Sequence, residues 1–385
     1  MEVSLAIGEA VQLADVDVVA AYPITPQTHI VEHIADLVAN GELNASYIPV
    51  ESEHSAMSAC LGSAAVGART FTATAGQGLE LMHEVLYVAA AMQLPIVMTV
   101  ANRALSAPLS VWGDHSDVMA VRDTGWIQIF TENGQEVFDN TLCAFRIGED
   151  PKVLLPVMVH LDGFHLSHMI EPIFIEEQEK VNEFLPPFKY PLALDPKKPV
   201  TMGAFAPPIV YSESKKAQEV NLMESKETIL KAWDEFGRIF GRKYSPVESY
   251  RVEGAKTLLM TMGSFSETAM ETIDKMRNEG KDVGLVRLRL WRPFPTKELR
   301  EAVKDAETLV VFDRAISLGA QSGPVCTEVR SALYKMDKKP KVASIIGGLG
   351  GRDVTVAHFE EIINLGIKMV QKGNDQEYAI FGVRE

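Results

Sequence analysis

Residues 70–101 read TFTATAGQGLELMHEVLYVAAAMQLPIVMTVA, a stretch in which the expected structure changes twice. Its first residues are β-rich, Gly76 and Gly78 then turn the chain, and a helix is predicted over 79–92. The apolar run 95–101 that follows has the length and composition of a buried strand. Strand, helix and strand in this order form the repeating unit of a parallel α/β sheet.

The same alternation continues on both sides of this unit. Upstream, strands and helices are predicted in turn at 16–22, 28–39, 46–50 and 51–66. Downstream, the alternation returns over 257–351. We therefore expect the fold class α/β, with parallel sheets.

The alternation weakens between residues 176 and 250. Seven prolines lie between 186 and 208, and we expect extended, irregular chain there, because proline lacks an N–H group and has a fixed φ. An amphipathic helix is predicted over 225–240. This region is interpreted as the connector between two α/β modules.

Composition narrows the class of protein. The 385 residues include 37 basic and 52 acidic side chains, a formal charge of −15, and 46% are hydrophobic. This is the composition of a folded globular protein, and the length favours two domains. An acidic surface argues against nucleic acid or an anionic membrane as the main partner.

The cysteines are few and scattered. Cys60, Cys143 and Cys326 form no CxxC pair, so no disulfide framework is predicted and a reducing compartment is favoured. Three thiols are too few for a cysteine-held iron–sulfur cluster within this chain. The start of the sequence lacks a basic n-region, and the most apolar stretch, 85–101, contains Gln93 and Pro95. We therefore expect a cytoplasmic protein.

Polar residues follow several predicted strands, which is where ligands bind in open α/β sheets. In the segment Tyr22–Thr28, Thr25 and Thr28 suit either a helix N-cap or a ligand contact. Glu51 and Glu53 precede a helix rich in small residues. The helix macrodipole favours acidic residues there, but a carboxylate among small side chains also suits a flat ligand.

Two further strand exits carry polar groups. The hydroxyls and glycines of 70–78 suit either a cradle for a polar ring or anion, or a plain turn. Arg103 suits either bidentate binding of a carboxylate or a structural ion pair with Asp114 or Asp117. Asp114 and His115 do not predict a catalytic triad, since no GxSxG elbow accompanies them.

The histidine spacing does not predict a metal site. His29 and His33 lie at i, i+4 spacing and are interpreted as helix-surface residues, and no acidic partner is identified for His165 and His168. The glycine-rich loop 347–351 is interpreted as conformational rather than phosphate-binding.

Taken together, these segments resemble the α subunit of the 2-oxoacid:ferredoxin oxidoreductases, and within that group the pyruvate:ferredoxin oxidoreductases most closely. The resemblance covers nearly the whole chain, in order, and the ordered set is specific although no single motif is decisive. The segments that carry it are Tyr22–Pro26, Glu51–Ser55, Thr70–Thr74, Gln77–Leu79, Asn102–Pro108, Gly113–Asp117, Arg122–Ile127, Arg292–Pro295 and Gly347–Asp353.

The resemblance implies a thiamine-diphosphate-binding fold. Residues 1–235 would form a pyrimidine-type domain with its proline-rich extension. Residues 250–365 would form a domain like the transketolase C-terminal domain, and residues 366–385 a C-terminal tail.

The resemblance also implies roles for three side chains. Glu53 would hydrogen-bond N1′ of the aminopyrimidine, which favours the imino tautomer that takes the C2 proton of the thiazolium. Arg103 would neutralise the carboxylate of a 2-oxoacid substrate. Thr25 would donate to that carboxylate or to the ketone oxygen, and it belongs with Glu53 to the cofactor-binding set. All three would act in catalysis.

A heteromeric enzyme is implied as well. The family's GDG-type motif for the diphosphate and Mg²⁺ is absent, since Gly113-Asp114-His115 lacks the second glycine, so that half-site would belong to a β subunit. The [4Fe–4S] clusters would belong to γ and δ (ferredoxin-like) subunits. This chain would be active only with these partners.

The implied reaction converts pyruvate, CoA and oxidised ferredoxin to acetyl-CoA, CO₂ and reduced ferredoxin. Two alternatives stay open: the same chemistry on 2-oxoisovalerate, 2-oxobutyrate or oxalate, and a non-catalytic assembly subunit. Related subunits acting on oxalate carry arginine where Thr25 stands, so Thr25 favours a monocarboxylic oxoacid. The presence of both Glu53 and Arg103 argues against a non-catalytic role.

Overall fold

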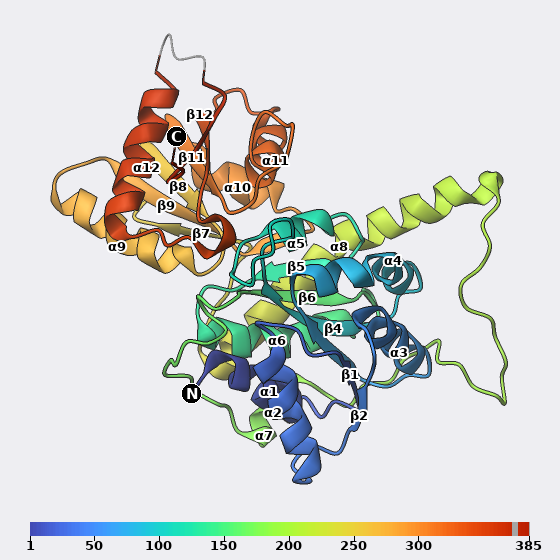
Figure 1. Ribbon diagram of the computed structural model, residues 1–385. Coiled ribbons are helices and arrows are strands. Elements are labelled where there is room, and N and C mark those ends of the chain that lie inside the picture. Colours follow the sequence, from blue (N-terminus) through green and yellow to red (C-terminus); the bar gives the residue numbers. More distant parts are fainter. Residues whose placement is uncertain (372–375, 385) are drawn as a thin grey trace.

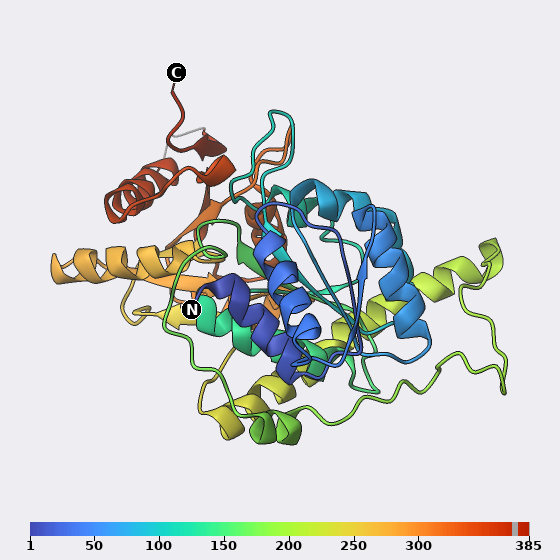
Figure 2. The same ribbon diagram turned by 60° about the horizontal axis from the view of Figure 1, so that its bottom comes forward.

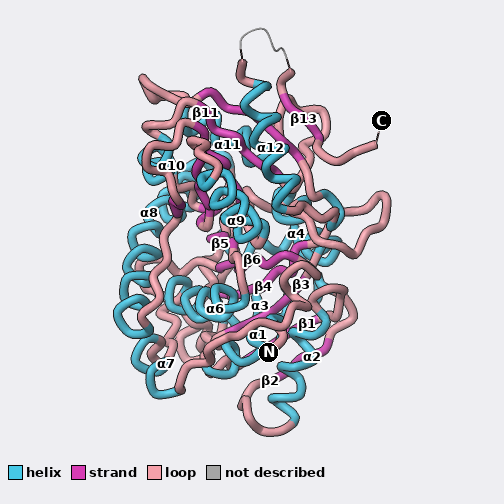
Figure 3. Tube along the Cα trace, turned by 90° about the vertical axis from the view of Figure 1, so that its left-hand side faces the viewer, coloured by secondary structure: helices cyan, strands magenta, loops and turns pink. Residues whose placement is uncertain are grey.

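The computed structural model describes residues 1–371 and 376–384, which form two sheets with helices on both faces (Figure 1). The first sheet is built mainly from the N-terminal half and lies in the lower part of the view. The second sheet is built from the C-terminal third and lies above it. Figure 3, seen from the side, shows the two sheets stacked one above the other.

The first sheet has seven strands in the order β10-β5-β6-β4-β3-β1-β2. Strands β1 to β6 pair in parallel, and β10 is antiparallel to β5. Strands β3, β4 and β6 are buried along their whole length, as near-continuous apolar runs predict for a sheet covered on both faces. The bounds are β1 Val18–Ala21, β2 Ser46–Pro49, β3 Thr70–Thr74, β4 Ile96–Asn102, β5 Ile127–Phe130, β6 Val157–Asp162 and β10 Leu290–Arg292.

Helices cover this sheet in two layers (Figure 2). Helices α1, α2 and α6 pack in one apolar cluster, and α3 and α4 pack in another. A short helix, α5, follows the loop after β4. The bounds are α1 Val3–Leu13, α2 Thr28–Ala39, α3 Glu53–Ala65, α4 Gly76–Ala91, α5 Ser116–Ala120 and α6 Gly134–Gly148.

The second sheet has six strands in the order β13-β12-β11-β8-β9-β7, and only β7 is antiparallel to its neighbour. Helices α10 and α11 lie over one face, and α9 and α12 over the other. The strands are β7 Val247–Tyr250, β8 Thr257–Thr261, β9 Val283–Leu288, β11 Thr308–Asp313, β12 Lys341–Ile346 and β13 Tyr378–Ile380. The helices are α9 Phe265–Asn278, α10 Thr296–Val303, α11 Pro324–Leu333 and α12 Val356–Met369.

The connector is more helical than the sequence predicts. After α7 (Gln178–Phe184), an extended loop leads to α8 (Pro208–Phe240), which spans 33 residues instead of beginning near 225. Proline at its first position fits a helix start, and Gly241, with φ of 80°, ends it. The first half of α8 projects away from both sheets (Figure 1).

Two short strands change the expected division of the chain. β10 comes from the C-terminal part of the sequence but joins the first sheet beside β5. β13 pairs with β12, so part of the expected tail 366–385 belongs to the second sheet, whereas residues 372–375 and 385 lie outside the described residues. The domain bounds 1–235 and 250–365 stay a proposal.

None of the helices in residues 1–371 and 376–384 combines the length and the apolar content that a bilayer span requires.

Candidate active site

Four neighbouring strands bring the expected site residues to one edge of the first sheet. In the order β4-β3-β1-β2, the strands are followed by Arg103, by the Gly76–Gly78 turn, by Thr25 and by Glu53. The carboxyl ends of parallel strands meet at the same edge, so residues far apart in sequence converge there.

Glu53 is the first residue of α3 and is only 6% exposed. The Ser52 side chain caps the helix by accepting a hydrogen bond from Ser55 N, so Glu53 is not needed as the cap. Its carboxylate accepts no hydrogen bond from any residue in the described ranges 1–371 and 376–384. By contrast, the nearby Glu51 is exposed and accepts a hydrogen bond of 2.7 Å from the Ser55 hydroxyl. A mostly buried carboxylate without a protein donor is available to a ligand that supplies one.

Gly78 makes room for this carboxylate. A Cβ atom at Gly78 would lie 2.6 Å from Glu53 Oε1 and 2.5 Å from Thr74 Oγ1, closer than atoms can approach. The Thr74 hydroxyl is itself buried, and it has no hydrogen-bond partner among the described residues. Glu53, Thr74 and the bare backbone of Gly78 therefore form a small polar recess at the exit of β3.

Arg103 is 7% exposed and lies beside this recess. Its Nε donates to Ser110 O at 2.9 Å, and its Nη1 donates to Thr25 O at 3.0 Å. Burial lowers the pKa of Arg103, and the charges of Asp117 and Glu53 oppose that shift. The guanidinium is held by two carbonyl groups and forms no ion pair with a carboxylate of the described residues, so its other N–H groups can bind an anion.

Asp117 has a different role from the ion pair considered for it. It is fully buried and accepts hydrogen bonds from Gly76 N at 3.0 Å, Arg103 N at 2.9 Å and Asn102 Nδ2 at 2.9 Å. It therefore ties the exits of β3 and β4 together, and it forms no hydrogen bond or ion pair with the guanidinium of Arg103. Burial raises the pKa of Asp117 to about 7, against these hydrogen bonds, which lower it.

Thr25 lies on the exposed side of the site. Its carbonyl group is the acceptor for Arg103, and its side chain makes no hydrogen bond within the described part of the chain. Gln27, which the sequence alone does not single out, fixes this turn: its Nε2 donates to Ala73 O at 2.9 Å, and its Oε1 accepts from Ile24 N at 3.1 Å. The sequence signal for Gln27 is its place in the loop between β1 and α2, at a strand exit.

Asp114 and His115 lie at the junction of the two sheets. Gly350 N donates to Asp114 Oδ2 at 3.0 Å, and His115 Nε2 lies 2.9 Å from Asp162 Oδ1. Arg314, which follows β11, pairs with Asp162 and donates to Gly113 O at 2.9 Å. Burial alone would raise the pKa of Asp162, but Arg314 and His115 outweigh it and hold that pKa well below its usual range.

Replacing Arg314 by Ala should lower the free energy of unfolding by about 3–5 kcal/mol, because Asp162 would keep its charge in a buried site without its main partner. Urea unfolding of the full chain at pH 7 measures the change. A carboxyl with a depressed pKa stabilises the fold above its unfolded pKa and loses this contribution as the pH falls. The difference between the two proteins should therefore shrink below about pH 4.

Arg238→Ala is the matched control for this variant. Arg238 is 72% exposed and lies 3.8 Å from Asp234, so its loss should change stability by less than about 1 kcal/mol. Equal effects of the two substitutions would contradict the role given to Arg314.

The glycine loop 347–351 supports the conformational interpretation. Gly348, Gly350 and Gly351 have φ of 65°, 55° and 76°, values that favour glycine. A Cβ atom at Gly351 would lie 2.4 Å from Trp112 Cβ, so the loop rests directly on the segment that follows Arg103.

A cavity of about 1170 Å³ lies away from this site, between the end of α4, residues 189–206 and the start of α8. None of the three expected site residues lines it. The case for the site at the sheet edge therefore rests on buried polar groups without partners, rather than on the size of a hollow.

Sequence comparison identifies the family. The family model "Pyruvate flavodoxin/ferredoxin oxidoreductase, thiamine diP-bdg" matches residues 9–233, more than half of the chain. The chain belongs to this family. A second model, "Pyruvate:ferredoxin oxidoreductase core domain II", matches residues 255–359. The expected resemblance is confirmed, as is thiamine diphosphate as the family's cofactor.

Two curated relatives are similar over almost their whole length. The pyruvate synthase subunit PorA of Methanocaldococcus jannaschii is 50% identical over 99% of this chain and 96% of its own. The ketoisovalerate oxidoreductase subunit VorA of Pyrococcus horikoshii is 47% identical over 94% of this chain and 91% of its own.

Solved structures confirm the expected fold class. The 2-oxoglutarate:ferredoxin oxidoreductase from Magnetococcus marinus has a TM-score of 0.69 at 20% identity, over 96% of this chain and 65% of that one. A split-gene transketolase has a TM-score of 0.58 at 11% identity, over 96% of this chain and 99% of that one. At these identities the likeness concerns the fold alone.

The residues at the sheet edge fit the pyrimidine part of thiamine diphosphate. A flat ring with a nitrogen and an amino group suits the Glu53 carboxylate, which is 6% exposed and accepts no hydrogen bond from the described residues, and the buried Thr74 hydroxyl, which has no partner among them. Gly78 leaves space for the ring beside them. Glu53 and Thr74 are the residues of this chain that would hold it.

Proposed function

We propose that this chain is the α subunit of a thiamine-diphosphate-dependent 2-oxoacid:ferredoxin oxidoreductase. Its reaction would be the oxidative decarboxylation of pyruvate with CoA to acetyl-CoA and CO₂, with reduction of ferredoxin. The observation that carries the proposal is the buried Glu53 carboxylate without a hydrogen-bond donor, beside Arg103, in a chain of this family.

Each site residue has a role that its surroundings support. Thiamine diphosphate, when bound, supplies the electron sink that decarboxylation of a 2-oxoacid requires. Glu53 would share a proton with a ring nitrogen, and with only 6% of the residue exposed little water can compete for this hydrogen bond. Arg103, oriented by the carbonyls of Ser110 and Thr25, would bind the substrate carboxylate. The Thr25 hydroxyl would donate to the same substrate.

The proposed enzyme is heteromeric. This chain has no GDG-type motif, so we assign the diphosphate and Mg²⁺ half-site to a β subunit. Its three cysteines are all buried and lie in separate apolar clusters, so we assign the [4Fe–4S] clusters to γ and δ subunits that pass electrons to ferredoxin. The CoA site and the cytoplasmic location stay predictions.

The substrate is the open part of this proposal. The PorA and VorA relatives are almost equally similar to this chain, so overall identity does not separate pyruvate from a branched 2-oxoacid. Thr25 favours a monocarboxylic substrate, because a second carboxylate would call for a cation at that position.

The enzyme purified from its native source tests the function. When pyruvate and CoA are added without an electron acceptor, the iron–sulfur clusters should be reduced, and their absorbance should bleach, within the time of one catalytic turnover. 2-Oxoisovalerate should bleach it at least about tenfold more slowly, a difference of roughly 1.4 kcal/mol in the barrier. A reversed order of rates would move the assignment to the branched-chain reaction. If none of the 2-oxoacids bleached the iron–sulfur absorbance of a complex that contains this chain, only the assembly role would remain.

A further inference from the structure

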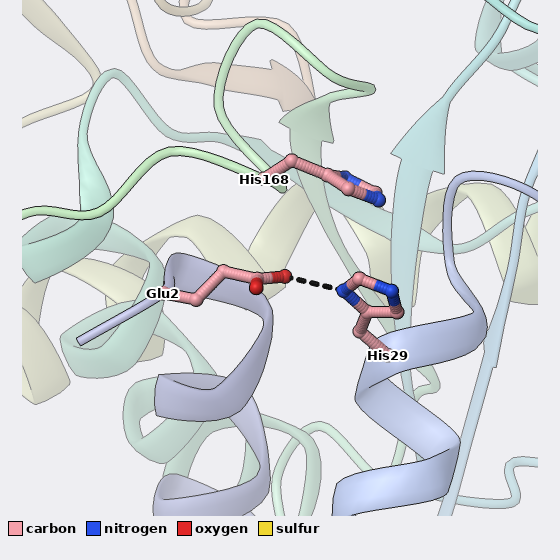
Figure 4. Close-up of side chains that lie close together, drawn as sticks. All are labelled: Glu2, His29 and His168. Atoms are coloured by element: carbon pink, nitrogen blue, oxygen red, sulfur yellow. Dashed lines mark hydrogen bonds and ion pairs between the residues drawn. The ribbon is translucent and has the colours of Figure 1, made fainter.

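Three potential metal ligands meet on the face formed by α1, α2 and the segment after β6 (Figure 4). Glu2 directly precedes α1, His29 lies in the first turn of α2, and His168 follows β6 by six residues. One ligand atom from each, two imidazole nitrogens and a carboxylate oxygen, all lie within 4.8 Å of one another.

The start of α1 is joined to the segment after β6 without help from the three side chains. Val3 N donates to Met169 O at 3.0 Å, and Ser4 N donates to Ser167 O at 3.1 Å. The Ser4 hydroxyl also donates to Ser167 O, at 2.6 Å. His168 is therefore presented to the start of α1 by fixed main-chain contacts, and the cluster is preformed.

The three side chains lie side by side, and His168 is oriented as a metal ligand usually is. His29 Nδ1 lies 2.7 Å from Glu2 Oε1, and the rings of His29 and His168 have centroids 4.6 Å apart. Ser167 Oγ lies 2.8 Å from His168 Nδ1, which leaves Nε2 of that ring for another partner. Phe164 packs against His168 at 4.6 Å between centroids. A hydrogen bond to the second ring nitrogen is the usual support of a metal-binding histidine.

A second His–Glu pair between α1 and α2 shows that His168 is not needed to join these two helices. One turn further along, His33 Nε2 lies 2.9 Å from Glu9 Oε1, and this pair has the same partners, α2 and α1. No second histidine adds to it within the described residues. The pair His29–Glu2 would equally join the two helices, so the additional imidazole of His168 calls for a separate explanation.

We propose that Glu2, His29 and His168 bind Zn²⁺ or a similar divalent transition-metal ion. Two imidazole nitrogens and one carboxylate oxygen suit Zn²⁺ and its neighbours, whereas Mg²⁺ and Ca²⁺ prefer oxygen ligands alone. The side chain of His29 is 44% exposed, so water completes the coordination from the solvent side. The ion would join α1, α2 and the segment after β6. Strand β6 itself ends at Asp162, in the junction of the two sheets. The proposal does not depend on the proposed reaction.

Zinc binding to the assembled enzyme tests this site. After treatment with a chelator, equilibrium dialysis against radioactive Zn²⁺ should show one more bound ion per copy of this chain in the wild-type enzyme than in His168→Gln. His29→Gln should lose the same ion. His33→Gln is the matched control and should keep it. Ser167→Ala removes the hydroxyl that supports His168, along with the hydrogen bond that it accepts from Phe164 N at 3.0 Å, and should weaken binding about 10- to 100-fold.

Diffraction separates this site from other metal sites of the complex. A crystal soaked in Zn²⁺, measured on both sides of the zinc absorption edge, should show an anomalous peak between the three side chains in the wild type and none there in His168→Gln. Equal zinc content in the wild type and both histidine variants, or peaks only elsewhere, would overturn the proposal. Unchanged pyruvate turnover of His168→Gln without zinc verifies that the variant is folded.

Discussion

Glu53→Gln should reduce turnover of the assembled enzyme by about 10²–10⁴-fold, the range expected when a positioned acid–base group is lost. Glutamine has almost the same shape as glutamate, so the recess at Gly78 stays filled, but an amide cannot share a proton with a ring nitrogen as a carboxylate does. The substitution also removes a buried charge without a donor, so the folded chain should not lose stability. Pyruvate-dependent reduction of ferredoxin, measured with saturating thiamine diphosphate, gives the turnover.

Glu51→Gln is the control for this variant. Glu51 lies two residues away and is exposed, and among the described residues its carboxylate accepts a hydrogen bond only from the Ser55 hydroxyl. The turnover of Glu51→Gln should therefore stay within about twofold of the wild type. If Glu53→Gln turned over as fast as Glu51→Gln, Glu53 would not be the cofactor's proton partner and the active-site assignment would fail.

Arg103→Ala should lower kcat/KM for pyruvate by about 100-fold, equivalent to about 2.7 kcal/mol, with most of the change in KM. Two carbonyl groups fix the guanidinium, and its remaining N–H groups form no ion pair with a carboxylate of the described residues. A substrate carboxylate would therefore find a preorganised cation, which alanine cannot replace. Initial rates over a range of pyruvate concentrations separate KM from kcat.

Arg103→Lys tests whether the charge or the planar fork matters. Lysine keeps the positive charge but cannot reach two carbonyl groups and bind a carboxylate in bidentate fashion, so its KM should lie between those of the wild type and Arg103→Ala. An unaltered KM in Arg103→Ala would show that this side chain only holds the turn at Thr25 in place, through the hydrogen bond that it donates there.

The hydrophobic alternation predicted much of the fold because most elements are simply amphipathic or simply buried. The helix expected at 28–39 and the strand expected at 308–313 match α2 and β11 to the residue. Helix α6 is not among the elements predicted from the sequence, and its buried residues include the polar Asp139 and Asn140. Arg242 Nη2 donates to Asp139 Oδ1 at 2.9 Å, and Trp233 Nε1 donates to Asn140 Oδ1 at 3.0 Å. In the sequence, such buried polar residues cannot be told from solvent-exposed ones until their hydrogen-bond partners are known.

The candidate site could be predicted in part from the sequence. Polar residues at strand exits could be recognised singly, and the family resemblance assigned roles to Glu53, Arg103 and Thr25. What the sequence could not show was which carboxylate is buried, since Glu51 and Glu53 occur in the same motif and only the structure separates them. The joining of Asp162 to Arg314 was equally hidden, because the two residues lie 152 positions apart.

Strand β10 limits how this polypeptide can be shortened. It lies about 160 residues after β5 in the sequence, yet it completes the edge of the first sheet, where Leu290 is opposite Ile129. A gene fragment that stops after α8 would leave the N–H and C=O groups of β5 unpaired along an open edge, which invites other chains to add to it. We therefore expect such a fragment to aggregate during expression. Any division of this protein into separately produced pieces would have to carry residues 290–292 along with the N-terminal one.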